Sequence, residues 1–319
     1  MESDLSAEVV MGKQHRALVA GATGYLGGEV AKALHGAGYW VRALARDPQR
    51  LSVRDVCDDV FVGEVTEPET LDGVMDGIDT VFSSIGLRSF ARKPTIWDVD
   101  CQANLDLVGL AERAGVRDFA FGSLFRGDEV RSHLAVAEAR ERVVDALRAS
   151  PMRHTVVRPN GFFNDMRDMF EMARRGRVWL VGDGNAAFNP IHGADIADAV
   201  VEQLAREGDD GVELSIGGPD VLSLRKVGQL AFDTLGKPAR FGRLPGWVLG
   251  ASSALLKPFN ANASTFLAMF GLMTGGDMIA PSVGSRHLAT FFEELVARET
   301  ASDHGRRRGD DALGSGVPK

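Results

Sequence analysis

Cysteine is scarce in this sequence, and the cysteines present fit no metal site or disulfide framework. The chain has 319 residues and two cysteines, Cys57 and Cys101, a sparing use that is typical of a reducing compartment. We therefore expect free thiols and a cytoplasmic protein. His, Cys, Asp and Glu form no cluster with metal-ligand spacing, and no Gly-x-Ser-x-Gly elbow occurs. The sequence predicts neither a metal site nor serine-hydrolase chemistry.

Long uninterrupted apolar runs are also missing. The most apolar region, 244–273, is broken by Pro245, Lys257 and Pro258, and it falls short of the roughly 20 apolar residues that span a bilayer. We interpret it as two packed helices and expect no transmembrane segment. Weak contact with a membrane surface stays open, because four aromatic residues could line an amphipathic face. They are Trp247, Phe259, Phe266 and Phe270.

Basic residues do not dominate the chain, whose formal net charge is −8 at pH 7. A surface that binds nucleic acid would need the opposite balance, so we expect no nucleic-acid partner. The hydrophobic share of 45% and the charged share of 25% are ordinary for a soluble globular protein. The length suits one large α/β domain with a substrate-binding extension. The N-terminal stretch 1–14 lacks an apolar signal core, so secretion is not expected.

Short apolar runs alternate with longer amphipathic ones along most of the chain. This alternation predicts a doubly wound parallel sheet with helices on both faces and ligands beyond the carboxyl ends of its strands. The main amphipathic runs are 95–114 and 132–149. The expected strands are Arg16–Ala20, Trp40–Leu44, Asp59–Gly63, Thr80–Ser84, Phe119–Gly122 and His154–Val157.

A glycine-rich stretch, GATGYLG over 21–27, follows the first expected strand and precedes a helical run. Gly21, Gly24 and Gly27 let the backbone turn tightly, and a helix start offers unpaired N–H groups to an anion. The spacing is Gly-x-x-Gly-x-x-Gly rather than the standard Gly-x-Gly-x-x-Gly. Its position between strand and helix nevertheless predicts a site for the pyrophosphate of a dinucleotide.

The end of the second expected strand indicates which dinucleotide is bound. An NAD site usually has an Asp or Glu there for the ribose hydroxyls, whereas this chain has Arg46, with Arg42 and Arg50 nearby. A guanidinium can bind a 2′-phosphate, so we predict NADP(H) in preference to NAD(H). The neighbouring Asp47 weakens this argument, and Arg46 could instead pair with it.

Six stretches of the sequence together carry a resemblance to a known family. They are GATGYLGG (21–28), ALARDPQRL (43–51), WDVDCQAN (97–104), VVRPNGFF (156–163), GDGNAAFNPIHGADIAD (182–198) and SIGGPDVLSL (215–224). With these stretches the chain resembles an atypical, extended short-chain dehydrogenase/reductase. It is similar to the subgroup that contains divinyl chlorophyllide 8-vinyl reductases, isoflavone-reductase-like proteins and NADP-sensing nitrogen-repression regulators.

The resemblance implies a position for each cofactor contact. Donors for the pyrophosphate would come from Thr23, Tyr25 and Leu26. The adenine would be flanked by Glu64 and Val65. The loop that passes beneath the nicotinamide ribose would be Ser84, Ile85 and Gly86. The residues that border the nicotinamide carboxamide would be Pro159, Asn160 and Phe162.

The Tyr-x-x-x-Lys pair of this superfamily has no counterpart here. Its tyrosine donates a proton and its lysine lowers the tyrosine pKa, but the corresponding positions hold His133 and Ala137. The only tyrosines, Tyr25 and Tyr39, are not placed for catalysis. Carbonyl reduction by the Tyr/Lys machinery is therefore doubtful.

Three explanations stay open at this point. The protein could reduce a conjugated C=C or carbonyl of an apolar organic molecule, with His133 as the acid and Ser123 orienting the substrate. It could instead be a non-catalytic NADP(H)-binding redox sensor that acts through a protein partner. It could also be an assembly protein that keeps its nucleotide for stability. His133 could equally be an inert surface residue.

The substrate side is expected after Pro159, with Phe163, Met166 and His192 lining a pocket. Ordinary core packing is the favoured interpretation of the Met/Phe stripe over 162–170. His192 and Asp195 form a possible acid/base pair, although Asp195 could simply support a helix start. We divide the chain into a flexible N-terminus (1–14), an NAD(P)-binding core (15–158), an interwoven substrate-side portion (159–298) and a disordered tail (299–319). The oligomeric state stays open.

Overall fold

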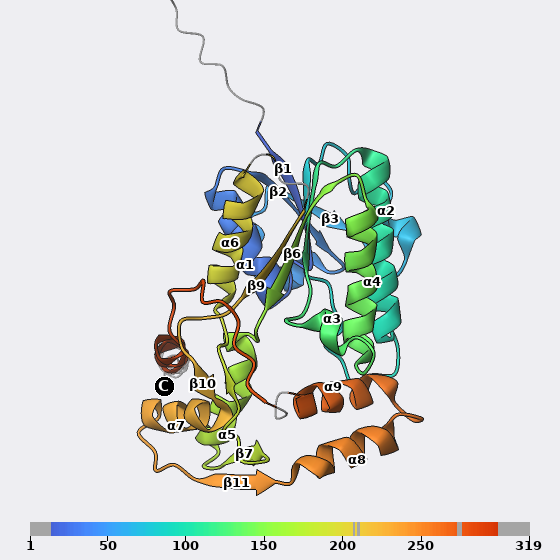
Figure 1. Ribbon diagram of the computed structural model, residues 1–319. Helices are drawn as coiled ribbons and strands as arrows, with labels where there is room; N and C mark the ends of the chain where they lie inside the picture. Colours follow the sequence, from blue (N-terminus) through green and yellow to red (C-terminus); the bar gives the residue numbers. More distant parts are fainter. Residues whose placement is uncertain (1–13, 207, 209–210, 273–275, 299–319) are drawn as a thin grey trace, which may run out of the picture.

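A seven-stranded parallel sheet forms the centre of the computed structural model, which describes residues 14–206, 208, 211–272 and 276–298 (Figure 1). The spatial order of its strands is β3-β2-β1-β4-β5-β6-β9, which confirms the predicted doubly wound sheet. The strands are β1 (Arg16–Ala20), β2 (Trp40–Ala45), β3 (Asp59–Val62), β4 (Thr80–Ser83), β5 (Asp118–Gly122), β6 (Arg153–Pro159) and β9 (Gly211–Ile216). The first six agree closely with the predicted strands.

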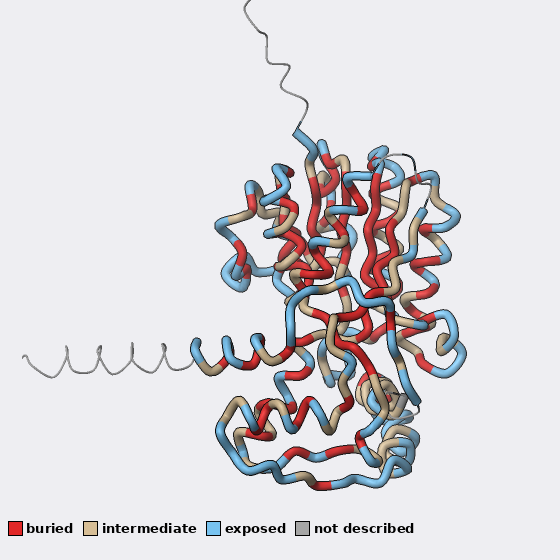
Figure 2. Tube along the Cα trace, turned by 60° about the vertical axis from the view of Figure 1, so that its left-hand side comes forward, coloured by how far each residue is buried: buried red, intermediate tan, exposed pale blue. Residues whose placement is uncertain are grey.

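Helices cover both faces of the sheet, because its central strands are apolar on both sides. On one face lie α1 (Tyr25–Gly36) and α6 (Gly193–Ala205), and on the other α2 (Ala103–Ala114) and α4 (Ala135–Ala149). Val19 of β1 packs toward the first pair, and its neighbour Leu18 packs toward the second. Figure 2 shows buried residues along the strands and along the inner sides of these helices.

The amphipathic runs predicted as helices form with small changes at their starts. A π-helical turn, Trp97–Gln102, leads into α2. The run predicted to start at Ser132 begins its helix only at Ala135, because residues 131–133 form a turn after the short α3 (Gly127–Val130).

A second, smaller core lies beyond the carboxyl ends of the strands. It contains α5 (Arg167–Arg174), α7 (Leu224–Thr234), a helix over 288–298, the parallel pair β7 (Val178–Val181) and β11 (Phe241–Leu244), and the antiparallel pair β8 (Ala187–Phe188) and β10 (Leu222–Ser223). Fully buried aromatic side chains fill it, namely Phe163, Phe170, Phe232 and Phe292. These residues come from distant parts of the chain, so the lobe depends on long-range packing.

The apolar region around 244–273 folds as α8 (Gly246–Leu256) and α9 (Ala261–Leu272), as predicted; Met273 lies outside the described residues. No helix in the described part of the chain combines the length and apolar character needed to cross a membrane. Short 3-10 turns occur at Pro48–Arg50, Arg54–Val56, Pro68–Leu71 and Phe163–Met166. The predicted flexible N-terminus, apart from Gln14, and the predicted tail lie outside the described residues.

Asp195 joins α6 to the segment that precedes the last helix. Its buried carboxylate accepts the backbone N–H groups of Ser285 (3.2 Å) and Arg286 (3.1 Å), and it pairs with the Arg286 guanidinium. It also lies in the first turn of α6, where a negative charge is favourable. These contacts assign Asp195 a structural role rather than a place in an acid/base pair.

Asp195→Ala should therefore lower the free energy of unfolding by about 2–3 kcal/mol, because it leaves charge-assisted hydrogen bonds unmade. Urea denaturation measures the loss. Asp198→Ala is the matched control, because Asp198 lies one helical turn away, is 64% exposed and makes one contact with Arg286. Its cost should stay within about 0.5 kcal/mol. Equal losses in the two variants would contradict the assigned role.

Candidate dinucleotide and substrate site

The turn from β1 into α1 has the close packing that a dinucleotide site needs. Gly21 has a positive φ of 93°, and Gly24 caps the helix without a side-chain hydrogen bond. A Cβ atom on Gly27 would overlap the backbone of Gly21. Only glycine therefore permits α1 to start this close to the turn. The N–H groups of the first turn of α1 lie at the carboxyl edge of the sheet, where they suit a pyrophosphate.

Three residues of the turn differ in what their side chains contribute. Thr23 is exposed, whereas Leu26 is buried and can offer only its backbone N–H. The Tyr25 hydroxyl accepts the backbone N–H of Gly193 (2.9 Å), and burial raises the pKa of Tyr25 to about 12. Its side chain thus joins α1 to α6 in this structure.

Arg46 and Glu64 meet at the carboxyl ends of β2 and β3. The Arg46 guanidinium lies 3.1 Å from a Glu64 carboxylate oxygen, and 64% of the Arg46 side chain is exposed. Asp47 does not bind Arg46; it accepts the backbone N–H of Gln49. Val65, the other residue predicted at the adenine, is half-buried and packs against the core on the α2 side.

The structure corrects the prediction that Arg42 adds positive charge near the cofactor. It lies within β2, pairs with Asp59 at 2.6 Å and donates to backbone carbonyls of residues 73, 74 and 76. Its guanidinium is therefore used within the fold. Arg50 is exposed on a short 3-10 turn, which leaves Arg46 as the better-placed cation.

The loop after β4, Ser84 to Gly86, lies directly against the glycine turn. The Ser84 N–H donates to Ala20, and a Cβ atom on Gly21 would approach the Ser84 hydroxyl to 2.9 Å. Ile85 is buried. This places the predicted ribose loop beside the predicted pyrophosphate turn.

An ion pair that the sequence did not reveal supports this loop from beneath. Arg140 of α4 pairs with Asp100 at 2.8 Å and donates to the carbonyl of Ile85 at 3.3 Å and to that of Gly122. Asp100 accepts the N–H of Leu87 at 2.9 Å. Asp100 belongs to the WDVDCQAN stretch, but no neighbouring residue in the sequence indicates that it pairs with an arginine of α4.

Ser123 lies at the end of β5, as predicted, but its hydroxyl faces a buried cluster of charges. It donates to Glu141 at 3.0 Å, and Glu141 is held by Arg158 at 2.6 and 2.8 Å. Arg158 also pairs with Glu213 at 2.9 Å. The structure thus shows Ser123 supporting a buried ion pair; its predicted contact with a substrate remains untested.

The other positions of the catalytic prediction lie on the start of α4 and before it. His133 is exposed on the turn that precedes the helix, and its backbone N–H donates to Val130. Ala137 is fully buried in the first turns of α4. The absence of a Tyr/Lys pair at His133 and Ala137 stays a prediction from the sequence.

Beyond β6, Asn160 and Phe162 have different roles. Pro159 ends the strand, and the Asn160 side chain is buried and donates to Asn189 (2.6 Å) and to the carbonyl of Met278. Its amide therefore helps to hold the 278–280 segment. Phe162 is half-buried, and its ring meets that of Tyr25 edge-on with centroids 6.2 Å apart.

Phe163 and Met166 belong to the second core. Phe163 has no exposed surface and Met166 has 4%, which agrees with the core packing favoured for the stripe. Their place in a substrate pocket stays a prediction. His192 remains partly exposed, with its ring among those of Tyr25, Phe163 and Phe291.

Asp165 and Arg88 are candidate site residues that the sequence did not identify. Arg88 lies after β4 and Asp165 lies after β6, and their side chains approach to 3.5 Å. The ion pair therefore joins the segments that follow two strands, β4 and β6, between which β5 lies in the sheet. Asp165 is 45% exposed, yet the surrounding protein still raises its pKa, against the opposing effects of Arg88 and the N–H of Phe162. Both properties fit a group in a concave surface.

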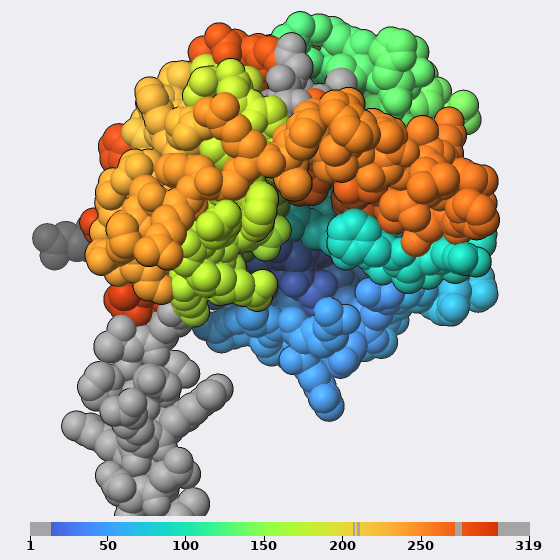
Figure 3. All heavy atoms as spheres, turned by 90° about the horizontal axis from the view of Figure 1, so that it is seen from below, coloured from blue at the N-terminus to red at the C-terminus, as the bar shows by residue number. Residues whose placement is uncertain are grey.

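A hollow opens at this edge of the sheet (Figure 3). The dark-blue N-terminal part of the chain forms its floor, and the lime segment after β6 borders one side. The orange α8 and α9 border another side. The glycine turn is therefore accessible from a cleft between the sheet and the second core.

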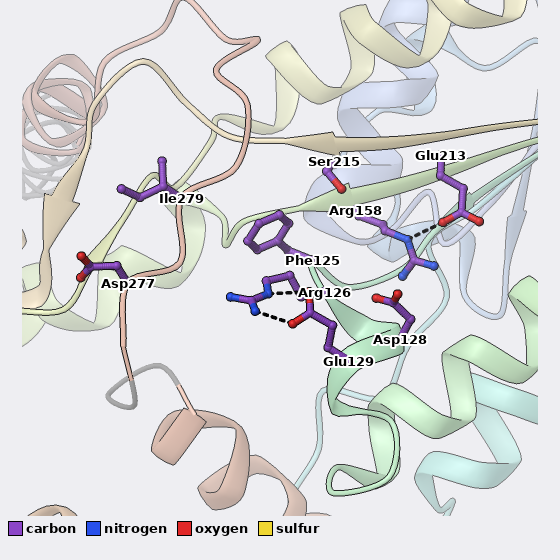
Figure 4. Close-up of a pocket in the computed structure, with 9 residues that line it drawn as sticks. All are labelled: Phe125, Arg126, Asp128, Glu129, Arg158, Glu213, Ser215, Asp277 and Ile279. Carbon is purple, nitrogen blue, oxygen red and sulfur yellow. Dashed lines mark hydrogen bonds and ion pairs between the residues drawn. The ribbon is translucent and has the colours of Figure 1, made fainter.

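A separate polar cavity of about 620 Å³ lies at the carboxyl ends of β6 and β9, beside α3 (Figure 4). In it Arg158 reaches Glu213 and Arg126 reaches Glu129, so these charges are balanced within the protein. Its lining residues are Phe125, Arg126, Asp128, Glu129, Arg158, Glu213, Ser215, Asp277 and Ile279. It shares Arg158 and Glu213 with the buried ion-pair cluster at Ser123, and none of the predicted site residues lines it.

The sheet, the glycine turn and the cleft define a dinucleotide-binding protein of the Rossmann type. The chain belongs to the NAD(P)H-binding family, which matches residues 21–207. Its curated relatives include reductases, which support a place in an NAD(P)H-dependent oxidoreductase family, and also the photosystem II assembly factor Ycf39 of Guillardia theta. This confirms the resemblance that the sequence motifs indicated.

Two curated relatives and one solved structure illustrate the match. Divinyl chlorophyllide a 8-vinyl-reductase of Oryza sativa is 27% identical over 93% of this chain and 81% of its own length. A (4-alkanoyl-5-oxo-2,5-dihydrofuran-3-yl)methyl phosphate reductase of Streptomyces griseus is 30% identical over 71% and 76%. The NADPH complex of an Escherichia coli NADPH-dependent quinone oxidoreductase superposes with a TM-score of 0.66 at 18% identity, over 88% of this chain and 99% of that one, which supports the fold.

The half-buried His192 imidazole should make the stability of the fold depend on pH. Its Nδ1 accepts the N–H of Ala194 as the N-cap of α6, and burial lowers its pKa below 6.5. In the unfolded chain the imidazole takes up a proton near pH 6.5, whereas in the folded chain it does so only at lower pH. The free energy of unfolding should therefore fall as the pH drops below 6.5. Burial lowers the pKa of His154 as well, which adds to the slope.

His192→Asn keeps an N-cap acceptor and removes one titrating group. Urea denaturation between about pH 7.5 and 5.5 should therefore show a shallower decline for the variant than for the parent. Identical slopes would contradict the assignment, whereas a uniform loss at every pH would report only the packing of the ring.

Proposed function

We propose that the protein is an NADPH-dependent reductase that acts on a conjugated C=C or carbonyl group of an apolar organic molecule. The observation that carries the proposal is the cleft: the N-terminal part of the chain forms its floor, and the segment after β6, whose Asp165 pairs with Arg88, borders it. The rice relative's name describes reduction of a vinyl group, and the Escherichia coli protein is named as a quinone oxidoreductase. Both names describe conjugated organic substrates.

The residues present fit a dinucleotide. The Gly21 backbone occupies the space that a Cβ atom on Gly27 would need, so α1 can start close to the turn only with glycine at this position. The N–H groups at the start of α1 could then bind a pyrophosphate. Arg46 would meet the adenosine end, and the Ser84–Gly86 loop and Phe162 the nicotinamide end. When bound, the nicotinamide would supply a hydride. The chain's own part is to orient the substrate, exclude water and hold a proton for it.

The preference for NADP(H) is proposed from Arg46. Its exposed guanidinium can leave Glu64 for a 2′-phosphate at little cost, because an exposed ion pair contributes little stability. Glu64 opposes the phosphate by its charge. The two side chains would therefore set the preference together.

Arg46→Ala should weaken NADPH binding by about ten- to hundredfold, since a charge-assisted hydrogen bond contributes about 1.5–3 kcal/mol, and should leave NADH binding almost unchanged. Fluorescence titration with both dinucleotides measures the ratio. Glu64→Gln should strengthen NADPH binding, and Arg50→Ala is the matched control. If Arg46→Ala bound NADPH as tightly as the parent, the preference would have to come from elsewhere.

We propose Asp165 as the proton donor that replaces the missing Tyr/Lys pair. Burial raises the pKa of its carboxyl group, which favours the protonated form, and the side chain pairs with Arg88. During reduction the Oδ–H bond of Asp165 would break as its proton passes to the substrate atom that has gained the electron pair. Solvent would then reprotonate the carboxylate, because the side chain is partly exposed.

Asp165→Asn should lower kcat by about 10²–10⁴-fold while NADPH affinity stays unchanged. NADPH oxidation would be followed with a panel of enones, quinones and vinyl-porphyrin pigments. The parent's kcat should fall as the pH rises through the pKa of Asp165, and this dependence should be absent in the variant. Asp168→Asn, at an exposed carboxylate nearby, is the matched control.

The sequence-based candidates are tested in the same assay. If His133→Ala or Ser123→Ala abolished turnover while Asp165→Asn stayed active, His133 or Ser123, and not Asp165, would be assigned to the catalytic step. Tight NADPH binding without turnover of any substrate, together with a co-purifying protein, would instead favour the redox sensor or assembly protein that the missing Tyr/Lys pair leaves open.

A further inference from the structure

Helix α8 (Gly246–Leu256) is apolar on all sides and carries no charged residue. A helix of this kind is normally buried in a core or in a membrane. Here none of its residues is buried. The described part of the chain therefore does not bury α8, although the apolar composition of this helix is typical of a buried one.

Large apolar side chains of α8, α9 and two adjoining loops are strongly exposed. They form what we call the hairpin patch: Phe90 (66% exposed), Trp247 (74%), Leu255 (72%), Phe259 (63%) and Phe270 (50%). Ser253 of α8 meets Ser264 of α9, so the two antiparallel helices bring the start of one beside the end of the other. The patch thus extends over both ends of the hairpin. Patches of this kind on a monomer mark interaction sites.

The hairpin is attached to the rest of the protein through α9. Asn262 donates to the carbonyls of Ala91 and Pro94 and accepts the N–H of Ile96 at 3.2 Å. The rings of Phe90 and Phe266 lie 5.2 Å apart. These contacts hold α9 against the loop after β4, and α8 lies below α9, near the bottom of Figure 1.

The charged residues in the segment of the chain that contains the hairpin have one sign. Residues 237–276 contain four basic residues and no acidic one, in a chain whose net charge is −8. The basic residues are all exposed: Lys237, Arg240, Arg243 and Lys257. A surface that attracts this face would repel most of the remaining protein, which would orient the molecule.

We propose that the hairpin patch binds the surface of an anionic lipid bilayer. Trp, Phe and Leu side chains would enter the headgroup boundary, and the flanking Lys and Arg would meet lipid phosphates. A second copy of this chain fits less well, because a symmetric contact would oppose the four cations to one another. The proposal concerns binding alone and does not rest on the reductase activity.

One consequence would link the two proposals. Helices α8 and α9 border the hollow that leads to the glycine turn (Figure 3). Binding through the hairpin would therefore bring the cleft near the lipid, where apolar molecules dissolve.

Flotation of the full-length protein with lipid vesicles tests the proposal. We expect binding to phosphatidylcholine vesicles that contain phosphatidylglycerol, weaker binding to phosphatidylcholine alone, and weakening by salt. Trp247→Ser/Leu255→Ser/Phe259→Ser should bind at least tenfold less tightly. Arg243→Glu/Lys257→Glu should lose the preference for phosphatidylglycerol, since each basic residue near such a surface contributes about fivefold.

Val62→Ser/Val221→Ser/Val283→Ser is the matched control, because it removes three apolar side chains that are 47–59% exposed elsewhere; it should float like the parent. NADPH titration of every variant verifies the fold and keeps the two proposals separate. Failure of the parent to float, or equal flotation of the first triple variant, would overturn the proposal. A dimer in sedimentation that the same variant abolishes, without vesicle binding, would assign the patch to a second copy.

Discussion

The contact between the glycine turn and the first helix is the constraint on which the site depends. The backbone of Gly21 occupies the space beside Gly27 that any side chain would need, so α1 starts directly at the carboxyl end of β1. Parallel strands bring their carboxyl ends to the same edge. The turn, Arg46, the Ser84–Gly86 loop and Phe162 therefore gather there, although they come from widely separated parts of the chain.

Polar side chains beneath this edge hold its loops rather than face the cleft. Arg140 and Asp100 support the loop after β4, Glu141 and Arg158 hold Ser123, and the amides of Asn160 and Asn189 tie down residues 278–280. Buried polar groups of this kind must be hydrogen-bonded to one another. A hydroxyl or amide at a strand end can thus be used within the fold, which is why motif position alone did not establish the roles of Ser123 and Asn160.

The strands and the doubly wound topology were predictable from local apolar periodicity, and so was the glycine turn from its place between strand and helix. The Met/Phe stripe predicted core packing correctly, because Phe163 and Met166 are buried in the second core. Arg42 was expected to add positive charge near the cofactor. It does not, because it lies within β2 and its guanidinium pairs with Asp59. Asp165 was missed, because its partner Arg88 follows a different strand, far away in the sequence, and no local pattern marks such a pair.

The sequence by itself determined the alternation of strands and helices and the dinucleotide turn, because each depends on residues close together in the chain. The tertiary structure alone decided which polar groups pair with one another in the interior, which acid pairs with Arg88 and which apolar helix lacks cover from the described residues. These properties depend on contacts between distant segments, and burial and charge pairing exist only after those segments have packed.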